Sequence, residues 1–259
     1  MLLPHDRHGS GPPLVLVHFL GGNHHIWEPV RDVLAASYDT VAVDLPGFGD
    51  APLDGNPTVE AIAARVRVTI DGLGLGRPAV AGISLGGGVA LELARQGAAS
   101  SATAISPIGF GTRREQRWAH RSLVNATQLS RLVRPVAPVL APIAPVRALA
   151  GWQSYGRPWR VPAEDFAAAV ESVATAPGME PTLDEIVFWD FRGPVSPDVP
   201  VTILWGRRDA LLLPRQGRRA ARIVPHARLV ELPGCGHIPF YDDREAVVRA
   251  LLEGVGATA

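Results

Sequence analysis

The feature that most constrains the fold is an alternation of short apolar runs with longer amphipathic stretches. Most of the short runs are continuously apolar, which is typical of strands buried on both faces of a parallel sheet. We therefore expect strands at residues 14–17, 40–43, 78–81, 103–105, 201–205 and 228–232.

Two of the longer stretches have the periodicity of amphipathic helices. Thr58 suits the N-cap of a helix that places Val59, Ile62, Ala63, Val66 and Ile70 on one face. Residues 243–253 repeat the pattern. Strands that alternate with helices predict an α/β fold, in which a mostly parallel sheet is flanked by helices through right-handed crossovers.

The alternation stops after Ile105, and residues 107–199 contain no strong strand pattern. A cluster of prolines between residues 135 and 145 excludes one continuous helix, with helices expected at 113–132 and 162–174. We expect residues 1–106 and 200–259 to form the core and residues 107–199 a mainly helical cap, or lid. The leucine, valine, proline and tryptophan residues of this insertion are expected to roof an apolar pocket, including Trp118, Trp152, Trp159 and Trp189.

The composition limits the partners of the chain. Its 25 basic residues are all arginine, its formal net charge is zero, and no stretch is basic enough to follow a phosphate backbone, so no nucleic-acid partner is expected. With 47% hydrophobic residues and 19% charged residues, intrinsic disorder is excluded. The single cysteine, Cys235, excludes an intrachain disulfide and is expected to pack rather than react.

No apolar run is long enough to span a membrane, and the first residues lack the layout of a signal peptide. We expect a cytoplasmic protein without a membrane span that acts on a small-molecule substrate. A homodimer is one possible assembly.

The clearest functional motif is Gly82-Ile83-Ser84-Leu85-Gly86, between a predicted strand and the start of a predicted helix. A serine in this setting lies on a tight turn above the edge of the sheet, and glycines flank it because the turn crowds the backbone. The following helix N-terminus offers N–H groups where an oxyanion would form. The motif predicts Ser84 as a nucleophile.

A serine nucleophile needs a base and a carboxylate that orients the base. Asp209 follows the strand at 201–205, and His237 follows the strand at 228–232. The order serine, aspartate, histidine is the order expected on this topology. Asp184 and Asp190 in the insertion are conceivable substitutes for Asp209, whereas the other histidines are poorer candidates by their positions.

With these residues the chain resembles the α/β-hydrolase superfamily, in its group of capped serine hydrolases, over essentially all of residues 14–253. His18-Phe19-Leu20-Gly21-Gly22 resembles the histidine–glycine oxyanion segment of the family, and Asp44-Leu45-Pro46-Gly47-Phe48-Gly49 resembles the loop after the next strand. The resemblance implies that the backbone N–H groups of Leu20 and Leu85 form the oxyanion hole.

Two features depart from the family pattern. Phe19 stands where a glycine usually follows the histidine, and a positive φ there would strain phenylalanine or displace the loop. Only 13 residues precede Leu14, which leaves little room for the two opening strands common in the family.

The loops that carry the predicted triad also supply apolar side chains. Phe19, Ile238 and Phe240 are the expected substrate contacts, whereas Arg207 and Arg208 are expected to face solvent. No cluster of histidine, cysteine and carboxylates has metal-ligand spacing, and the pair His24-His25 is expected to open a helix. We expect neither a metal nor another cofactor.

These residues predict a serine hydrolase that cleaves a small, mainly apolar ester through an acyl-enzyme. The same triad could support carbon–carbon bond hydrolysis, lactone opening, thioester hydrolysis or cofactor-free perhydrolysis. A carbon–carbon hydrolase would need a cationic end to its pocket, whereas Arg113, Arg114, Arg117 and Arg121 are expected on a solvated helix face. A non-catalytic ligand receptor on the same fold is the alternative from another class.

Overall fold

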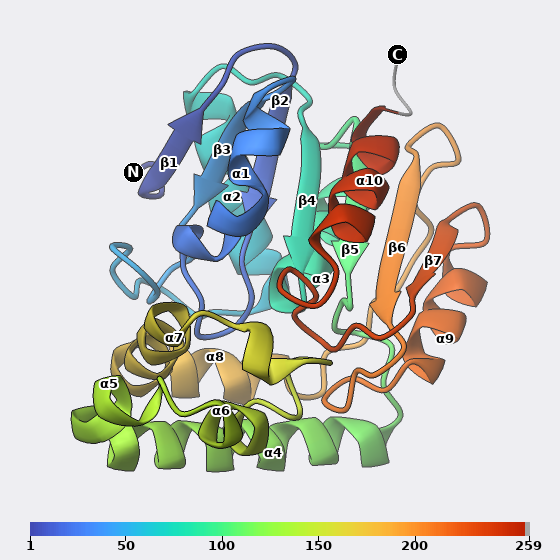
Figure 1. Cartoon of the computed structure of the whole chain (residues 1–259). Helices are drawn as coiled ribbons and strands as arrows, with labels where there is room; N and C mark the ends of the chain where they lie inside the picture. Colours follow the sequence, from blue (N-terminus) through green and yellow to red (C-terminus); the bar gives the residue numbers. More distant parts are fainter. Residues whose placement is uncertain (257–259) are drawn as a thin grey trace.

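The computed structural model describes residues 1–256. Its strands are β1 (His5–His8), β2 (Pro13–Val17), β3 (Asp39–Val43), β4 (Ala79–Ile83), β5 (Ser101–Ile105), β6 (Val201–Gly206) and β7 (Arg228–Leu232). They form one seven-stranded sheet in the order β1-β3-β2-β4-β5-β6-β7 (Figure 1). Every pairing is parallel except that of β1 with β3. The predicted α/β fold class is confirmed.

All the predicted strands are present, with small shifts at their ends. Strand β1 was not predicted, and it pairs His5 with Val43 and His8 with Thr40 at the edge of the sheet. The segment before β2 thus has room for one opening strand. The sequence His-Asp-Arg-His hides it, because an edge strand needs no apolar run.

Side chains of the strands alternate between two apolar layers. Leu14 and Leu16 of β2 cluster with residues of α1 (Glu28–Ala35) and α10 (Arg244–Val255). Val15 and Val17 cluster with residues of α2 (Val59–Gly72), α3 (Leu85–Arg95) and α9 (Arg215–Ile223). Figure 1 shows α1 and α10 in front of the sheet. Because both faces are covered, β4, β5 and β6 are buried at every residue, as their apolar sequences indicate.

Two predicted helices start at the expected caps. The Thr58 hydroxyl accepts a hydrogen bond from the backbone N–H of Ala61 at the start of α2. The Asp243 carboxylate accepts one from Ala246 at the start of α10. Each cap satisfies an N–H that has no acceptor within the helix.

Between β5 and β6 the chain forms only helices and loops. The helices are α4 (Arg113–Val133), α5 (Ala137–Leu140), α6 (Ala144–Ala150), α7 (Ala163–Thr175) and α8 (Met179–Ile186), with short 3-10 helices at Arg134–Val136 and Pro158–Arg160. Helices α4 and α7 occupy the two predicted stretches, and the proline cluster divides the chain between α4 and α6 into short pieces.

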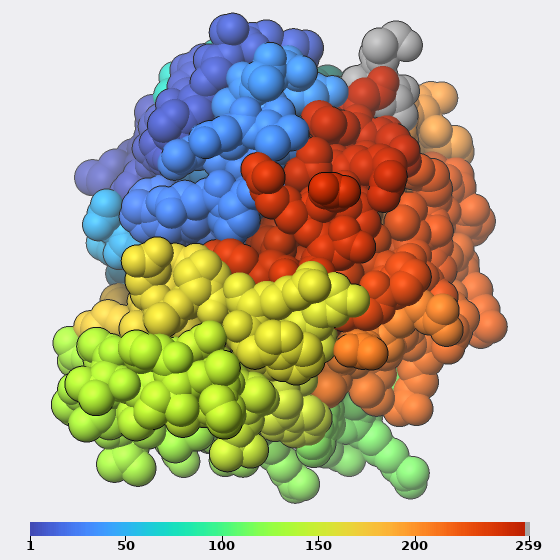
Figure 2. Space-filling view, viewed as in Figure 1, coloured from blue at the N-terminus to red at the C-terminus, as the bar shows by residue number. Residues whose placement is uncertain are grey.

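The insertion lies beyond the carboxyl ends of the parallel strands (Figure 1). Figure 2 shows it in yellow and green, packed directly against the core. The loops that follow β2, β4, β6 and β7 therefore meet beneath the insertion. Among residues 1–256, no helix is both long enough and apolar enough to cross a bilayer.

Candidate active site

Ser84 lies on the turn between β4 and α3 in a strained conformation, with φ 58° and ψ −112°. The glycines on either side are sterically required. A Cβ on Gly82 would lie 2.0 Å from the carbonyl oxygen of Gly86, and a Cβ on Gly86 would lie 2.1 Å from that of Val17. The turn lifts Ser84 above the sheet edge, as the motif predicts.

Asp209 and His237 come together from two different loops. Asp209 follows β6, His237 follows β7, and Nδ1 of His237 lies 2.8 Å from Oδ2 of Asp209. Both residues are almost fully buried. A buried carboxylate bonded to Nδ1 fixes the ring so that Nε2 is the nitrogen available for proton transfer.

The second oxygen of Asp209 is also bonded. Its Oδ1 accepts hydrogen bonds from the backbone N–H groups of Leu211 at 3.0 Å and Leu212 at 2.8 Å. These bonds fix the carboxylate in the orientation that meets His237. The two carboxylates considered as substitutes lie elsewhere, because Asp184 is near His120 and Asp190 accepts from Gln116.

Ser84 and His237 line the same cavity of about 170 Å³, here named the central cavity. The structure records no hydrogen bond between the Ser84 hydroxyl and Nε2 of His237 among the described residues. Such contacts are often long in the absence of substrate and tighten when it binds. Ser84 also lines a narrow cavity of about 50 Å³, which His237 does not reach.

Two backbone N–H groups near Ser84 have no acceptor within residues 1–256. Leu85 is the first residue of α3, so its N–H has no acceptor within the helix. Leu20 lines both the central and the narrow cavity. Unpaired donors beside a serine hydroxyl are the groups that an oxyanion hole requires.

His18 holds the loop that carries Leu20. Its Nε2 accepts from the N–H of Leu45 at 2.9 Å, and its Nδ1 lies 2.7 Å from the carbonyl oxygen of Phe19. This arrangement needs a neutral ring that donates from Nδ1. Burial lowers the pKa of His18 to about 4, so the ring stays neutral near pH 7.

Phe19 does not suffer the strain that the family pattern suggested. Among the described residues other than glycine, only Ser84 and Ser106 have positive φ. The left-handed position falls on Gly21, with φ 83°. Phenylalanine therefore fits this loop because the turn is made two residues later.

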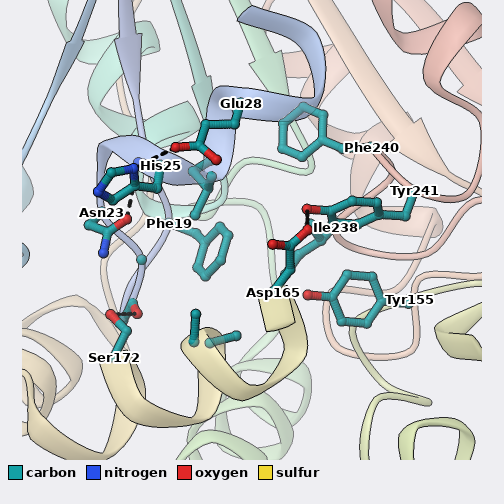
Figure 3. Close-up of a pocket in the computed structure, with 15 residues that line it drawn as sticks. Phe19, Asn23, His25, Glu28, Tyr155, Asp165, Ser172, Ile238, Phe240 and Tyr241 are labelled. Atoms are coloured by element: carbon teal, nitrogen blue, oxygen red, sulfur yellow. Dashed lines mark hydrogen bonds and ion pairs between the residues drawn. The ribbon is translucent and has the colours of Figure 1, made fainter. Parts of the chain in front are cut away.

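The predicted substrate contacts lie around the central cavity and its neighbour. Phe19 and Ile238 line the central cavity, whereas Phe240 lines an adjoining one (Figure 3). Arg207 and Arg208 are exposed, as expected.

The predicted tryptophan roof is wrong for three of its four residues. Trp189 lines the narrow cavity. The side chains of Trp118, Trp152 and Trp159 are 44%, 52% and 52% exposed, and they line none of these three cavities. Aromatic content alone does not tell which face of a helix a side chain occupies. The predicted leucines and valines do contribute, because Leu123, Val170 and Val173 line the central cavity together with Ala126.

Asp242 is a site residue that the sequence analysis missed. It is 1% exposed, and its Oδ2 accepts from the N–H groups of Gly236 and Gly156, both at 2.8 Å. Its Oδ1 accepts from the N–H of Arg157 at 2.6 Å. Asp242 thereby connects the His237 loop to the insertion. The only sequence signal is a second carboxylate beside Asp243, one more than the N-cap of α10 needs.

The surroundings of Cys235 and of the pair His24-His25 are those of structural residues. Cys235 is buried, and burial raises the pKa of its thiol to about 12, which leaves it protonated. His24 and His25 lie in a 3-10 helix, where His24 contacts Asp44 and His25 contacts Glu28.

Comparisons with known proteins agree on the family. The model of the alpha/beta hydrolase family matches residues 14–250. A pimeloyl-[acyl-carrier protein] methyl ester esterase of Neisseria meningitidis is 30% identical over 249 residues, which cover 93% of this chain and 93% of the relative.

Two solved structures show the same fold. A thermophilic esterase from Thermogutta terrifontis has a TM-score of 0.74 at 23% identity, and the match covers 99% of this chain and 93% of the esterase chain. The enol-lactonase from Burkholderia xenovorans has a TM-score of 0.77 at 21% identity, with 98% and 96% covered. Likeness at this level of identity concerns the fold alone.

Proposed function

We propose, given that this chain belongs to the α/β-hydrolase family and is a hydrolase, that it cleaves a small, mainly apolar ester with Ser84, His237 and Asp209. The observation that carries the proposal is the buried His237–Asp209 pair, 2.8 Å apart, whose His237 lines the same cavity as the strained Ser84. Residues 107–199 would act as the cap over this cavity.

In the proposed reaction, Nε2 of His237 removes the proton of the Ser84 hydroxyl as its oxygen attacks the ester carbonyl. Asp209 holds the ring and stabilises the imidazolium that forms. His237 then gives the proton to the departing alcohol, which leaves an acyl group on Ser84. Water, activated by His237, hydrolyses this acyl-enzyme and restores the serine.

The negative oxygen that develops on the carbonyl would be stabilised by the N–H groups of Leu85 and Leu20. Neither N–H has an acceptor of its own among the described residues, and α3 directs its positive end toward the site. One such donor contributes about 3 kcal/mol to the transition state in comparable hydrolases.

The lining supports an ester with apolar parts. Leu123, Val170 and Ile238 contribute to the central cavity, and no arginine of the described residues lines it. Arg117 and Arg121 of α4 are exposed, so a substrate carboxylate would find no guanidinium there. This favours ester cleavage over carbon–carbon hydrolysis of a diketo acid. Lactone opening, thioester hydrolysis and perhydrolysis would use the same groups.

The test compares substrates and a covalent label. A fluorophosphonate should label the parent protein and not Ser84→Ala. Neutral p-nitrophenyl esters, screened across acyl lengths, should be turned over at least about tenfold better in kcat/KM than lactones, thioesters or vinylogous diketo acids. A better turnover of one of those classes would replace the ester assignment, and a protein inert to the label would support the receptor alternative.

A further inference from the structure

A second large cavity adjoins the central one. It has a volume of about 230 Å³ and lies between the loop after β2, the start of α7 and the loop after His237 (Figure 3). We name it the side cavity. Phe19, Tyr155, Ala169 and Ile238 line both cavities, so these residues form the wall that the two share.

Aromatic rings make up much of the side cavity. They belong to Phe19, Tyr155, Phe240 and Tyr241. The rings of Tyr155 and Tyr241 are 6.4 Å apart between centroids and inclined at 56°. Aromatic faces carry partial negative charge and attract alkylammonium groups, most strongly where water is excluded.

The formal charge in the side cavity is negative. Asp165 accepts a hydrogen bond from the Tyr241 hydroxyl at 2.6 Å through Oδ2, and its Oδ1 has no partner among the described residues. Glu28 lies against His25, with 2.6 Å between Oε1 and Nδ1. No arginine is among the described residues that line the cavity, and Asp165 has no ion-pair partner within residues 1–256, so its negative charge is uncompensated.

The two tyrosines add polar groups but no charge. Burial raises the pKa of both hydroxyls well above the ordinary value for tyrosine, and nearby carboxylates raise it further. Tyr155 is nine-tenths buried, and its hydroxyl has no hydrogen-bond partner within residues 1–256. Figure 3 shows this hydroxyl directed into the side cavity. A hydroxyl that faces the cavity is available to hydrogen-bond to a polar group of a ligand.

The position of His237 indicates which half of a substrate would reach the side cavity. The base returns its proton to the departing alcohol, so the alcohol lies on the His237 side of Ser84. His237 lines the central cavity, which borders the side cavity, but it does not line the narrow cavity. The acyl group would then occupy the narrow cavity, with its apolar Leu183 and Ile186.

We propose that the side cavity binds an alkylammonium group on the alcohol half of the ester substrate, between the aromatic rings and Asp165. The proposal rests on ester hydrolysis at Ser84. It names a substrate class that combines an apolar acyl chain with a positively charged alcohol.

A matched pair of substrates tests the proposal. Butyrylcholine and 3,3-dimethylbutyl butyrate have the same shape and differ in the positive charge. The parent protein should prefer the choline ester by about tenfold in kcat/KM at low salt, which corresponds to ~1.4 kcal/mol. Asp165→Asn should reduce the preference to within about threefold.

Two control variants define what the carboxylate does. Asp184→Asn removes an exposed carboxylate of the insertion outside the side cavity and should leave the preference unchanged. Tyr241→Phe removes the hydrogen bond to Asp165 but keeps the charge, and it should also retain the preference. Equal turnover of the two esters by the parent, or a preference that survives Asp165→Asn, would overturn the proposal.

Direct binding separates this inference from the proposed function. Calorimetry with benzyltrimethylammonium chloride on Ser84→Ala should show binding that weakens about fivefold or more when Asp165→Asn is added. If hydrolysis depends on Ser84 but the cation does not bind, only the ammonium site is wrong. If hydrolysis persists in Ser84→Ala, the proposed function is wrong and with it the place of the ammonium group in the reaction.

Discussion

Oδ2 of Asp242 accepts a hydrogen bond from the backbone N–H of Gly156 at 2.8 Å, across 86 residues of sequence. The same oxygen accepts from Gly236, immediately before His237, and the N–H of Ile238, immediately after it, donates to the carbonyl oxygen of Ser154 at 2.7 Å. The base of the proposed triad is therefore held on both sides, once through Asp242 and once directly by the insertion.

Asp242→Asn should lower both stability and turnover. The carboxylate now accepts hydrogen bonds from three backbone N–H groups, those of Gly156, Arg157 and Gly236. An amide has only one acceptor oxygen, so at least one of these N–H groups would face the amide NH2 group instead. We expect a loss of about 1–3 kcal/mol in the free energy of unfolding, measured by urea titration. Since His237 would be less well placed, kcat should fall more than KM changes.

Asp243→Asn is the matched control for this substitution. Asparagine is as good an N-cap as aspartate, so α10 should keep its start and turnover should stay close to that of the parent. Equal effects of the two substitutions would show that Asp242 has no special role at the site.

Ser84→Ala and His237→Ala should each reduce kcat by at least about 10³-fold while leaving the protein folded. The double variant should be no more than severalfold worse than either single variant, because the two residues act as one unit. Steady-state kinetics with a p-nitrophenyl ester and circular dichroism provide the measurements. Multiplicative losses, or a Ser84→Ala protein within tenfold of the parent, would contradict the proposed triad.

The stability of the protein should depend on His18 in mild acid. Burial lowers the pKa of His18 to about 4, below the ordinary value near 6.5 of the unfolded chain. Below about pH 6.5 the unfolded chain takes up a proton that the folded protein does not. The contribution of His18 to the free energy of unfolding is therefore fully present above this pH and is lost as the pH falls toward 4. Between pH 7.5 and 5 we expect this group to cost about 2 kcal/mol.

His18→Gln should lose less stability over that interval, because glutamine does not titrate and can still accept from the N–H of Leu45. Denaturant titrations at pH 7.5 and 5 measure the difference. His226→Gln, at an exposed histidine, should behave like the parent. A His18→Gln protein with the same acid dependence as the parent would show that His18 does not contribute to it.

Gly86→Ala should destabilise the turn that carries Ser84 far more than Gly88→Ala. A Cβ at Gly86 would meet the backbone carbonyl of Val17 at 2.1 Å, whereas at Gly88 the nearest atom is a side-chain carbon of Ile108 at 2.9 Å. The backbone of β2 cannot yield, but the Ile108 side chain can. We expect the free energy of unfolding to fall by more than about 2 kcal/mol in Gly86→Ala and to change by no more than about 1 kcal/mol in Gly88→Ala. Thermal unfolding of the two proteins decides between them.

The sequence predicted the features that depend on local pattern. Continuous apolar runs located the central strands, and the serine motif, read with strand order, located Ser84, Asp209 and His237 at one edge of the sheet. Asp209 and His237 are in contact, and Ser84 and His237 line one cavity, but their part in catalysis stays a prediction until the variants are measured. The same holds for the boundaries at residues 107 and 199, the cytoplasmic location and the homodimer.

Features that depend on distant partners could not be predicted. The role of Asp242 follows from amides near residue 156, and the side cavity arises where Tyr155 and Asp165 of the insertion meet Phe19 and Tyr241 of the core. Strand β1 owes its place to β3 rather than to its own polar sequence. The exposed tryptophans show the converse, since an apolar composition did not reveal which way the side chains point.

The hydrogen bonds that fix the chain on both sides of His237 limit how chimeras of such proteins can be made. A chimera that replaces the whole insertion with that of a relative would displace the backbone groups of Ser154, Gly156 and Arg157 that fix the base. The stretch from 154 to 157 would have to be inherited with the loop that carries His237 and Asp242. The helices before and after that stretch could then be exchanged to change the substrate range, while residues 154–157 of the insertion stay with the loop that carries His237.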